Sequence, residues 1–129
     1  MDTQLIAQAA RATLAGSHPF PEIVRQLISA GVEYYHVDYA GLRKTFYSAE
    51  GDAVSTTITF EGLPPVAADF DATALKANIT DSQQNGQKFR DFTRRAMESG
   101  VQSYFAFLRS KRVTYFGRQG DQHTEWFPQ

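Results

Sequence analysis

The chain has 129 residues, no cysteine and a formal net charge of −1. This length suffices for one domain with its own core, and the absence of cysteine excludes disulfides, thiolate metal sites and cysteine nucleophiles. The first residues lack the features of a secretory signal, and no stretch has the roughly 18 apolar residues of a membrane span, so we expect a cytoplasmic protein that does not enter a membrane.

Two helices and three strands are expected in the first half of the chain. Apolar residues at helical spacing predict helices over 3–15 and about 21–30, which end at Gly16 and Gly31. Residues rich in tyrosine, valine and threonine then predict three strands, over 32–39, 42–48 and 54–60. The sequence between the last two strands is typical of a hairpin turn.

The second half is expected to repeat this order. A helix begins after Asp71, a good N-cap, and a second helix ends at Gly100. Three strands are predicted to follow, over 101–108, 112–116 and 123–127. The first of these carries large side chains on both sides, and we expect it to be central in its sheet and buried on both faces. The expected sides are Val101, Phe105 and Phe107 on one and Tyr104, Ala106 and Leu108 on the other.

An internal echo supports the repeated order. Residues 28–47 align with 97–116 at an offset of 69, which matches Gly31 with Gly100 and Tyr35 with Tyr104. Short turns favour antiparallel pairing, and the helices must cover a sheet face. We therefore predict an α+β fold, a two-layer sandwich of two pseudo-repeated helix-helix-three-strand halves with a largely antiparallel sheet. It forms a single domain over 1–129, with halves of about 1–64 and 65–129.

Two pairs of histidine and acidic residues are the candidates for a metal site. His36 and Asp38 share one face of a strand, and so do His123 and Glu125. If the two strands were neighbours, these side chains could bind zinc, manganese or iron in a metal-dependent or small-ligand enzyme. The alternative is that both are ordinary polar pairs. No motif predicts a cofactor, and we expect none.

Basic and aromatic residues suggest a second kind of site. Residues 86–118 hold eight basic and two acidic side chains, a formal +6. Together with the aromatic strands, the basic residues could bind an anion or single-stranded nucleic acid. The candidate contacts are Arg43, Arg109, Lys111, Arg112 and Arg118. The plainer interpretation, a sheet core with amphipathic tyrosines at its rim, ranks above nucleic-acid binding.

Two large apolar residues, Trp126 and Phe127, lie close to the end of the chain. Such side chains need a surface to pack on, and a second copy of the chain could supply it. A homodimer is therefore a further expectation.

Three stretches also resemble a known family. Residues 31–39 (GVEYYHVDY), 61–67 (EGLPPVA) and 116–127 (FGRQGDQHTEWF) are similar to the YbcV/YdfO-like family of small bacterial proteins, several of them encoded in prophages. The resemblance implies a two-layer domain of helices and strands, and it implies no activity and no functional residues. Our leading interpretation is thus a non-enzymatic binding domain, whose partner is an unknown macromolecule or a second copy.

Overall fold

The computed structural model describes residues 1–128, and within them the chain forms four helices and six strands. The first half contains α1 (Thr3–Ala15), α2 (Phe20–Ser29), β1 (Val32–Asp38), β2 (Arg43–Ser48) and β3 (Ala53–Thr57). The second half contains α3 (Ala72–Asn85), α4 (Phe89–Glu98), β4 (Val101–Phe107), β5 (Arg112–Gly117) and β6 (Gln122–Trp126). The predicted α+β class and the repeated helix-helix-three-strand order are both confirmed.

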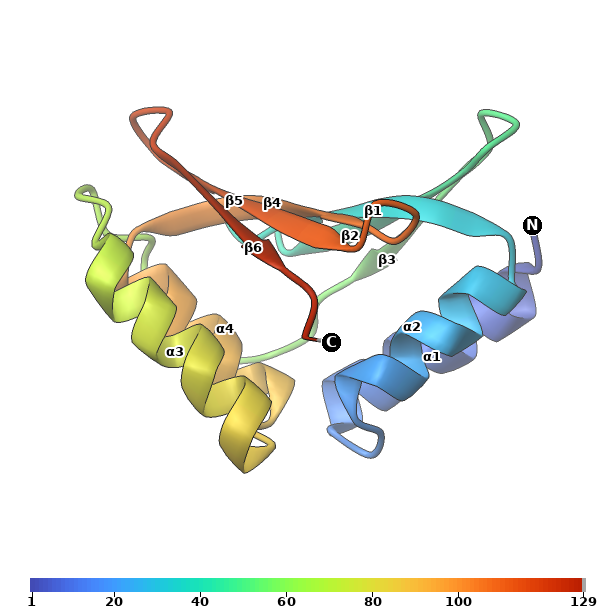
Figure 1. Cartoon of the computed structure of the whole chain (residues 1–129), viewed down its shortest axis with the longest axis horizontal. Coiled ribbons are helices and arrows are strands. Elements are labelled where there is room, and N and C mark those ends of the chain that lie inside the picture. Colours follow the sequence, from blue (N-terminus) through green and yellow to red (C-terminus); the bar gives the residue numbers. More distant parts are fainter. Residues whose placement is uncertain (129) are drawn as a thin grey trace.

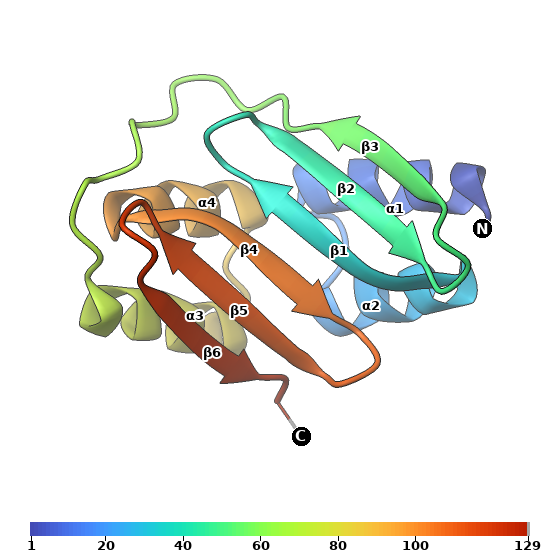
Figure 2. The ribbon, with the colours of Figure 1, turned by 90° about the horizontal axis from the view of Figure 1, so that it is seen from above.

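All strands belong to one antiparallel sheet with the order β3-β2-β1-β4-β5-β6. The helices form a second layer on one side, where α1 and α2 lie under the first half and α3 and α4 under the second (Figure 1). Figure 2 looks onto the opposite side of the sheet, with the helices behind it. We call this uncovered side the open face.

The two halves meet at the pair β1–β4, where His36 lies opposite Phe105. These two residues are 69 positions apart (105 − 36), the offset of the sequence echo. In the same ladder Tyr34 pairs with Phe107. Adding 69 to the first number and subtracting 69 from the second gives Ser103 and Asp38, which are also a pair. An approximate two-fold axis therefore passes perpendicularly through the sheet between His36 and Phe105.

Local features obey the same symmetry. Asp2 and Asp71 cap the first helix of each half, and each carboxylate accepts a backbone N–H at 3.0 Å. Leu42 and Lys111 are the two non-glycine residues with positive φ in the described chain, at 54° and 60°. Because the equivalent turns and caps agree, the repeat extends from the sequence to the backbone conformation.

The core lies between the sheet and the helices. Val37 and Ala106 are fully buried at the centre of the sheet, against helix residues such as Ile6 and Leu75. Four tyrosines are buried in this layer, in agreement with the plainer interpretation of the aromatic strands: Tyr35, Tyr39, Tyr104 and Tyr115. Burial raises the pKa of each of these phenols above its ordinary value.

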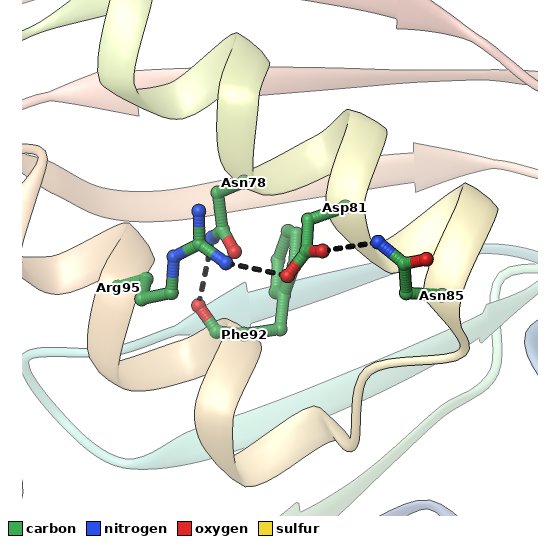
Figure 3. Close-up of polar contacts among 5 residues, drawn as sticks. All are labelled: Asn78, Asp81, Asn85, Phe92 and Arg95. Carbon is green, nitrogen blue, oxygen red and sulfur yellow. Dashed lines mark hydrogen bonds and ion pairs between the residues drawn. The ribbon is translucent and has the colours of Figure 1, made fainter.

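Polar side chains join α3 to α4 (Figure 3). The buried Asn78 amide donates to the carbonyl oxygen of Phe92 at 3.1 Å. Nearer the surface, Asp81 accepts from Asn85 at 2.6 Å and from Arg95 at 2.7 Å. These two donors hold the pKa of the Asp81 carboxyl below its ordinary value. The bonds fix the register of the two helices.

The expectation for residues 101–108 is confirmed in one respect and wrong in another. β4 is central, since it pairs with β1 and β5. However, Phe105 and Phe107 are only partly buried, because no helix covers the open face. Val101 was also assigned to the wrong side. A bulge between Val101 and Ser103 places Val101 in the core with Tyr104.

The internal repeat allows a matched test of how closely the backbone packs at Gly100. Gly31 and Gly100 are equivalent, with φ of +90° and +91°, so alanine at either position costs about 1–2 kcal/mol of backbone strain. At Gly100 a Cβ would also overlap the carbonyl oxygen of Asp69, whereas at Gly31 its nearest contact is the Met1 Cα at 3.5 Å. We expect Gly100→Ala to lose at least about 2 kcal/mol more than Gly31→Ala in urea unfolding. Equal losses would contradict this packing.

Candidate functional site

The two histidine-acid pairs do not come together. His36 and Asp38 lie on β1 at the centre of the sheet, and His123 and Glu125 lie on the edge strand β6, with β4 and β5 between them. The cross-strand pairs run from His36 through Phe105 and Thr114 to Thr124. Thr124 therefore shares a face with His36, and its neighbours His123 and Glu125 belong to the other face.

Each pair has local partners instead. The His123 Nε2 lies 3.3 Å from Glu125 Oε1, and the Asp38 carboxylate accepts the Gly41 N–H at 3.0 Å. The His36 ring lies 4.4 Å from the Phe105 ring. Burial lowers the pKa of His36, while the charge of Asp38 acts in the opposite direction. Within residues 1–128, no group of three or more His, Cys, Asp or Glu side chains is placed to hold a metal ion.

The five basic candidates divide into two groups. Arg109, Lys111 and Arg112 gather at the β4–β5 turn and the start of β5. Arg118 lies at the opposite end of β5, where its Nη1 donates to the Val66 carbonyl oxygen at 3.3 Å. Arg43 is equivalent to Arg112 by the two-fold axis and so lies at the opposite end of the sheet. Only the first group forms a basic cluster.

Beside this cluster, one row of cross-strand neighbours on the open face is rich in aromatic residues. It crosses β2, β1, β4, β5 and β6, with one residue from each strand. We call it the aromatic band, and it consists of Tyr47, Tyr34, Phe107, Arg112 and Trp126. Adjacent strands are about 4.8 Å apart, so the five side chains form one continuous line across the sheet.

The side chains of the band contact one another. The Tyr34 and Tyr47 rings are stacked, with centroids 4.6 Å apart and an interplanar angle of 10°. Phe107 follows at 6.3 Å from Tyr34. At the other end, the Arg112 guanidinium lies 5.1 Å from the centre of the Trp126 ring. Trp126 is 60% exposed, so the band presents aromatic surface to solvent.

The two-fold axis provides a comparison within the same fold. Tyr34, Phe107 and Trp126 are equivalent to Ser103, Asp38 and Thr57, which lie in the matching row at the other end of the sheet. The matching row also holds Phe116 and Arg43, the equivalents of Tyr47 and Arg112. Its backbone is built in the same way although three of its five side chains are small or polar where the band has aromatic rings. The rings of Tyr34, Phe107 and Trp126 are therefore not required by the fold.

The sequence contained a partial signal for this site. Alternation places Tyr34 and His36 on one side of a strand, and Phe105 and Phe107 on one side of another. What joins Tyr34 to Phe107 is the pairing of β1 with β4, two strands separated by more than sixty residues of chain. The band was missed because this pairing has no local signature.

The comparisons with known proteins add no family. Models of known protein families gave no match to the chain, and neither did the curated proteins. Membership of the YbcV/YdfO-like family therefore stays a prediction. In the part of the chain that the structure describes, the helices are all too short or too polar to cross a membrane.

A buried lysine was also missed by the sequence analysis. Lys44 on β2 is only 4% exposed, on the helix-covered side of the sheet. Its Nζ lies 4.2 Å from the centre of the Phe89 ring and 5.8 Å from that of Tyr35. No acidic side chain among residues 1–128 forms an ion pair with it. Burial lowers the pKa of Lys44 to about 7.

This lysine predicts a pH-dependent stability. The pKa is lower in the folded chain than in the unfolded chain, so folding is penalised as pH falls from about 10.5 to 7, and the penalty is constant below 7. The shift sets an upper limit of about 5 kcal/mol on this penalty, and the net penalty is smaller because cation–π attraction to Phe89 favours the charged form. We expect Lys44→Met to stabilise the protein by about 3 kcal/mol at pH 6 and by less at pH 9.5, measured by urea unfolding. A gain independent of pH would contradict this assignment.

Proposed function

We propose that this chain is a non-enzymatic domain that binds single-stranded nucleic acid on the aromatic band, in the cytoplasm. The observation that carries the proposal is a line of partly exposed aromatic rings, two of them stacked, beside a basic cluster at one end of a two-fold symmetric sheet. It supports the binding interpretation of the sequence and narrows it to one surface and one class of ligand.

Stacking supplies the sequence-independent part of the binding. Every base has a flat apolar face, and stacking on an aromatic side chain contributes about 1–3 kcal/mol per base. Tyr34 and Phe107 lie near the middle of the sheet, and Trp126 lies at its edge with 60% exposure. A strand of nucleic acid laid along the band meets these rings in turn.

Charge is arranged to suit phosphate groups along part of that path. Arg109, Lys111 and Arg112 lie beside the Phe107 and Trp126 portion of the band. At the same end of the sheet, the β2–β3 turn carries Glu50 and Asp52 beside Tyr47. We expect the phosphates to pass over β4, β5 and β6 and to avoid the acidic turn.

The shape of the apolar surface favours a linear ligand over a broad protein interface. The neighbouring row on the open face crosses the same strands through Thr45, His36, Phe105, Thr114 and Thr124, and Phe105 is its one large apolar side chain. The Thr114 and Thr124 hydroxyls bond one another at 3.0 Å. Protein interfaces have a compact apolar centre with a polar rim, whereas here the rings follow a line across the sheet, and Phe105 is the one ring beside it in a neighbouring row that is otherwise polar.

The first test removes the exposed ring. We expect fluorescence anisotropy to detect binding of labelled dT12 or rU12 at low salt, and we expect Trp126→Ala to weaken it about tenfold, since one stacking contact is lost. Thr57→Ala, at the equivalent position of the other half, should bind like the parent protein. In the parent protein Trp126 is the one tryptophan, and its emission should be quenched by bound oligonucleotide.

The second test removes the Arg112 guanidinium, which lies over the Trp126 ring. Arg112→Ala should weaken binding and reduce the slope of log K against log salt by about 0.7, the value for one phosphate contact to a single strand. Its equivalent, Arg43→Ala, should leave the slope unchanged.

Two outcomes would overturn the proposal. One is an absence of binding of either oligonucleotide at low salt and micromolar protein. The other is a dimer in sedimentation that Trp126→Ala dissociates, because the band would then be the interface between two copies of the chain.

A further inference from the structure

A recess lies beside the middle of the band and also includes residues that do not belong to the band. It is lined by Glu33, Tyr34, Phe107, Arg109 and Ser110, where the start of β1 meets the β4–β5 turn, and its volume is about 440 Å³. Pockets of about 300–1,000 Å³ hold small ligands. Two of its lining residues, Tyr34 and Phe107, belong to the band, so a base entering the recess lies next to bases stacked on the surface.

We infer that this recess is a base-selective subsite, and that Glu33 makes it prefer guanine. The inference rests on the proposed binding of single-stranded nucleic acid and adds a sequence preference to it.

The Glu33 carboxylate has acceptor capacity to spare. Its contact with a charged partner is to Arg109 Nη1, at 3.8 Å, and the Arg109 side chain is 88% exposed. An exposed ion pair at this distance contributes little. The carboxylate, with two oxygens and about four acceptor sites, therefore remains able to accept hydrogen bonds from a ligand.

The acceptor-only chemistry of a carboxylate discriminates among the bases. Guanine presents two adjacent donors on its Watson–Crick edge, N1–H and N2–H, which match the two carboxylate oxygens. Adenine and cytosine place an acceptor beside their amino donor, and uracil and thymine place carbonyl oxygens on both sides of N3–H. Single-stranded bases are read on these edges, and a bidentate pair contributes about 1–3 kcal/mol of discrimination.

The equivalent location at the other end of the sheet lacks these features. Glu33 is equivalent to Gln102, whose amide donates to the Gly117 carbonyl oxygen at 3.2 Å and so serves the sheet itself. Arg109 is equivalent to Ala40, and the two aromatic walls are equivalent to Ser103 and Asp38. The fold thus does not require a carboxylate beside two aromatic residues at this place.

The experiment compares dT12 with the same oligonucleotide carrying one central dG, dA, dC or deoxyinosine. We expect one dG to tighten binding about tenfold relative to dT12, and deoxyinosine, which lacks the N2 amino group, to recover only part of that gain. Glu33→Gln should abolish the dG preference, because an amide replaces one acceptor with a donor. Glu50→Gln removes the same charge from the other turn at this end of the sheet and should keep the preference.

The outcomes separate the inference from the function beneath it. Binding of every oligonucleotide with equal affinity, or a dG preference that survives Glu33→Gln, would overturn the base-selective subsite and leave the stacking surface in place. A failure of all oligonucleotides to bind would overturn both.

Discussion

The antiparallel pairing of β1 with β4 is the constraint on which the rest of the molecule depends. The ladder from Tyr34 to Asp38 joins two similar halves into one sheet about a two-fold axis perpendicular to it. Such an axis keeps both helix pairs on the same side, as Figure 1 shows. An axis lying in the sheet along the strands would pair them in parallel and send the helix pairs to opposite faces. The open face is therefore a geometric consequence of how the halves meet.

The same arrangement brings the two halves into contact on the covered side. Phe20 at the start of α2 packs against Phe127, which follows β6, with ring centroids 5.4 Å apart.

The repeat separates what the fold needs from what it merely tolerates. On the backbone, equivalent positions agree: the N-caps, the glycines after the second helices and the hydroxyl pairs across the outer strands. On the covered side most positions also agree in character, as Tyr35 and Tyr104 or Phe46 and Tyr115 do, although Lys44 matches Val113. On the open face the two equivalent outer rows differ, since Tyr34, Phe107 and Trp126 of one correspond to Ser103, Asp38 and Thr57 of the other. Because both rows lie on the same kind of backbone, the difference between them is a property of the surface. A binding role for the aromatic band accounts for that difference.

Local signals in the sequence predicted the elements well. Asp71, Gly16 and Gly31 mark helix ends through backbone hydrogen bonding and positive φ, which depend on a few neighbouring residues. The echo at an offset of 69 predicted the two halves.

The pairing of strands that are distant in the sequence could not be predicted from local signals, and the wrong predictions depend on that pairing. The apolar pattern of β4 resembles that of a strand buried on both faces, yet Phe105 and Phe107 are covered by aromatic neighbours across the sheet and not by a helix. The pairs His36–Asp38 and His123–Glu125 were correctly expected to share a face within each strand, but their separation depends on strand order. Lys44 occupies a position of β2 whose side chain points to the core by strand alternation. Only the position of β2 above the helices shows that its charge is buried.

The rings of the band are held in place before any ligand arrives. Tyr34 and Tyr47 are stacked on each other, Phe107 packs near Phe105 at 5.8 Å, and Arg112 lies over Trp126. Ordering a mobile side chain on binding costs about 0.5–1.5 kcal/mol. Side chains that already occupy one arrangement avoid most of this cost. They also sit on the strands of one sheet and not on a loop, so their spacing follows the strand spacing of about 4.8 Å. A preorganised line of rings at fixed spacing suits a ligand that is itself a line of flat groups. The same rigidity would disfavour a partner that required the surface to reshape, which is why the geometry supports a stacked single strand above a protein that adapts to it.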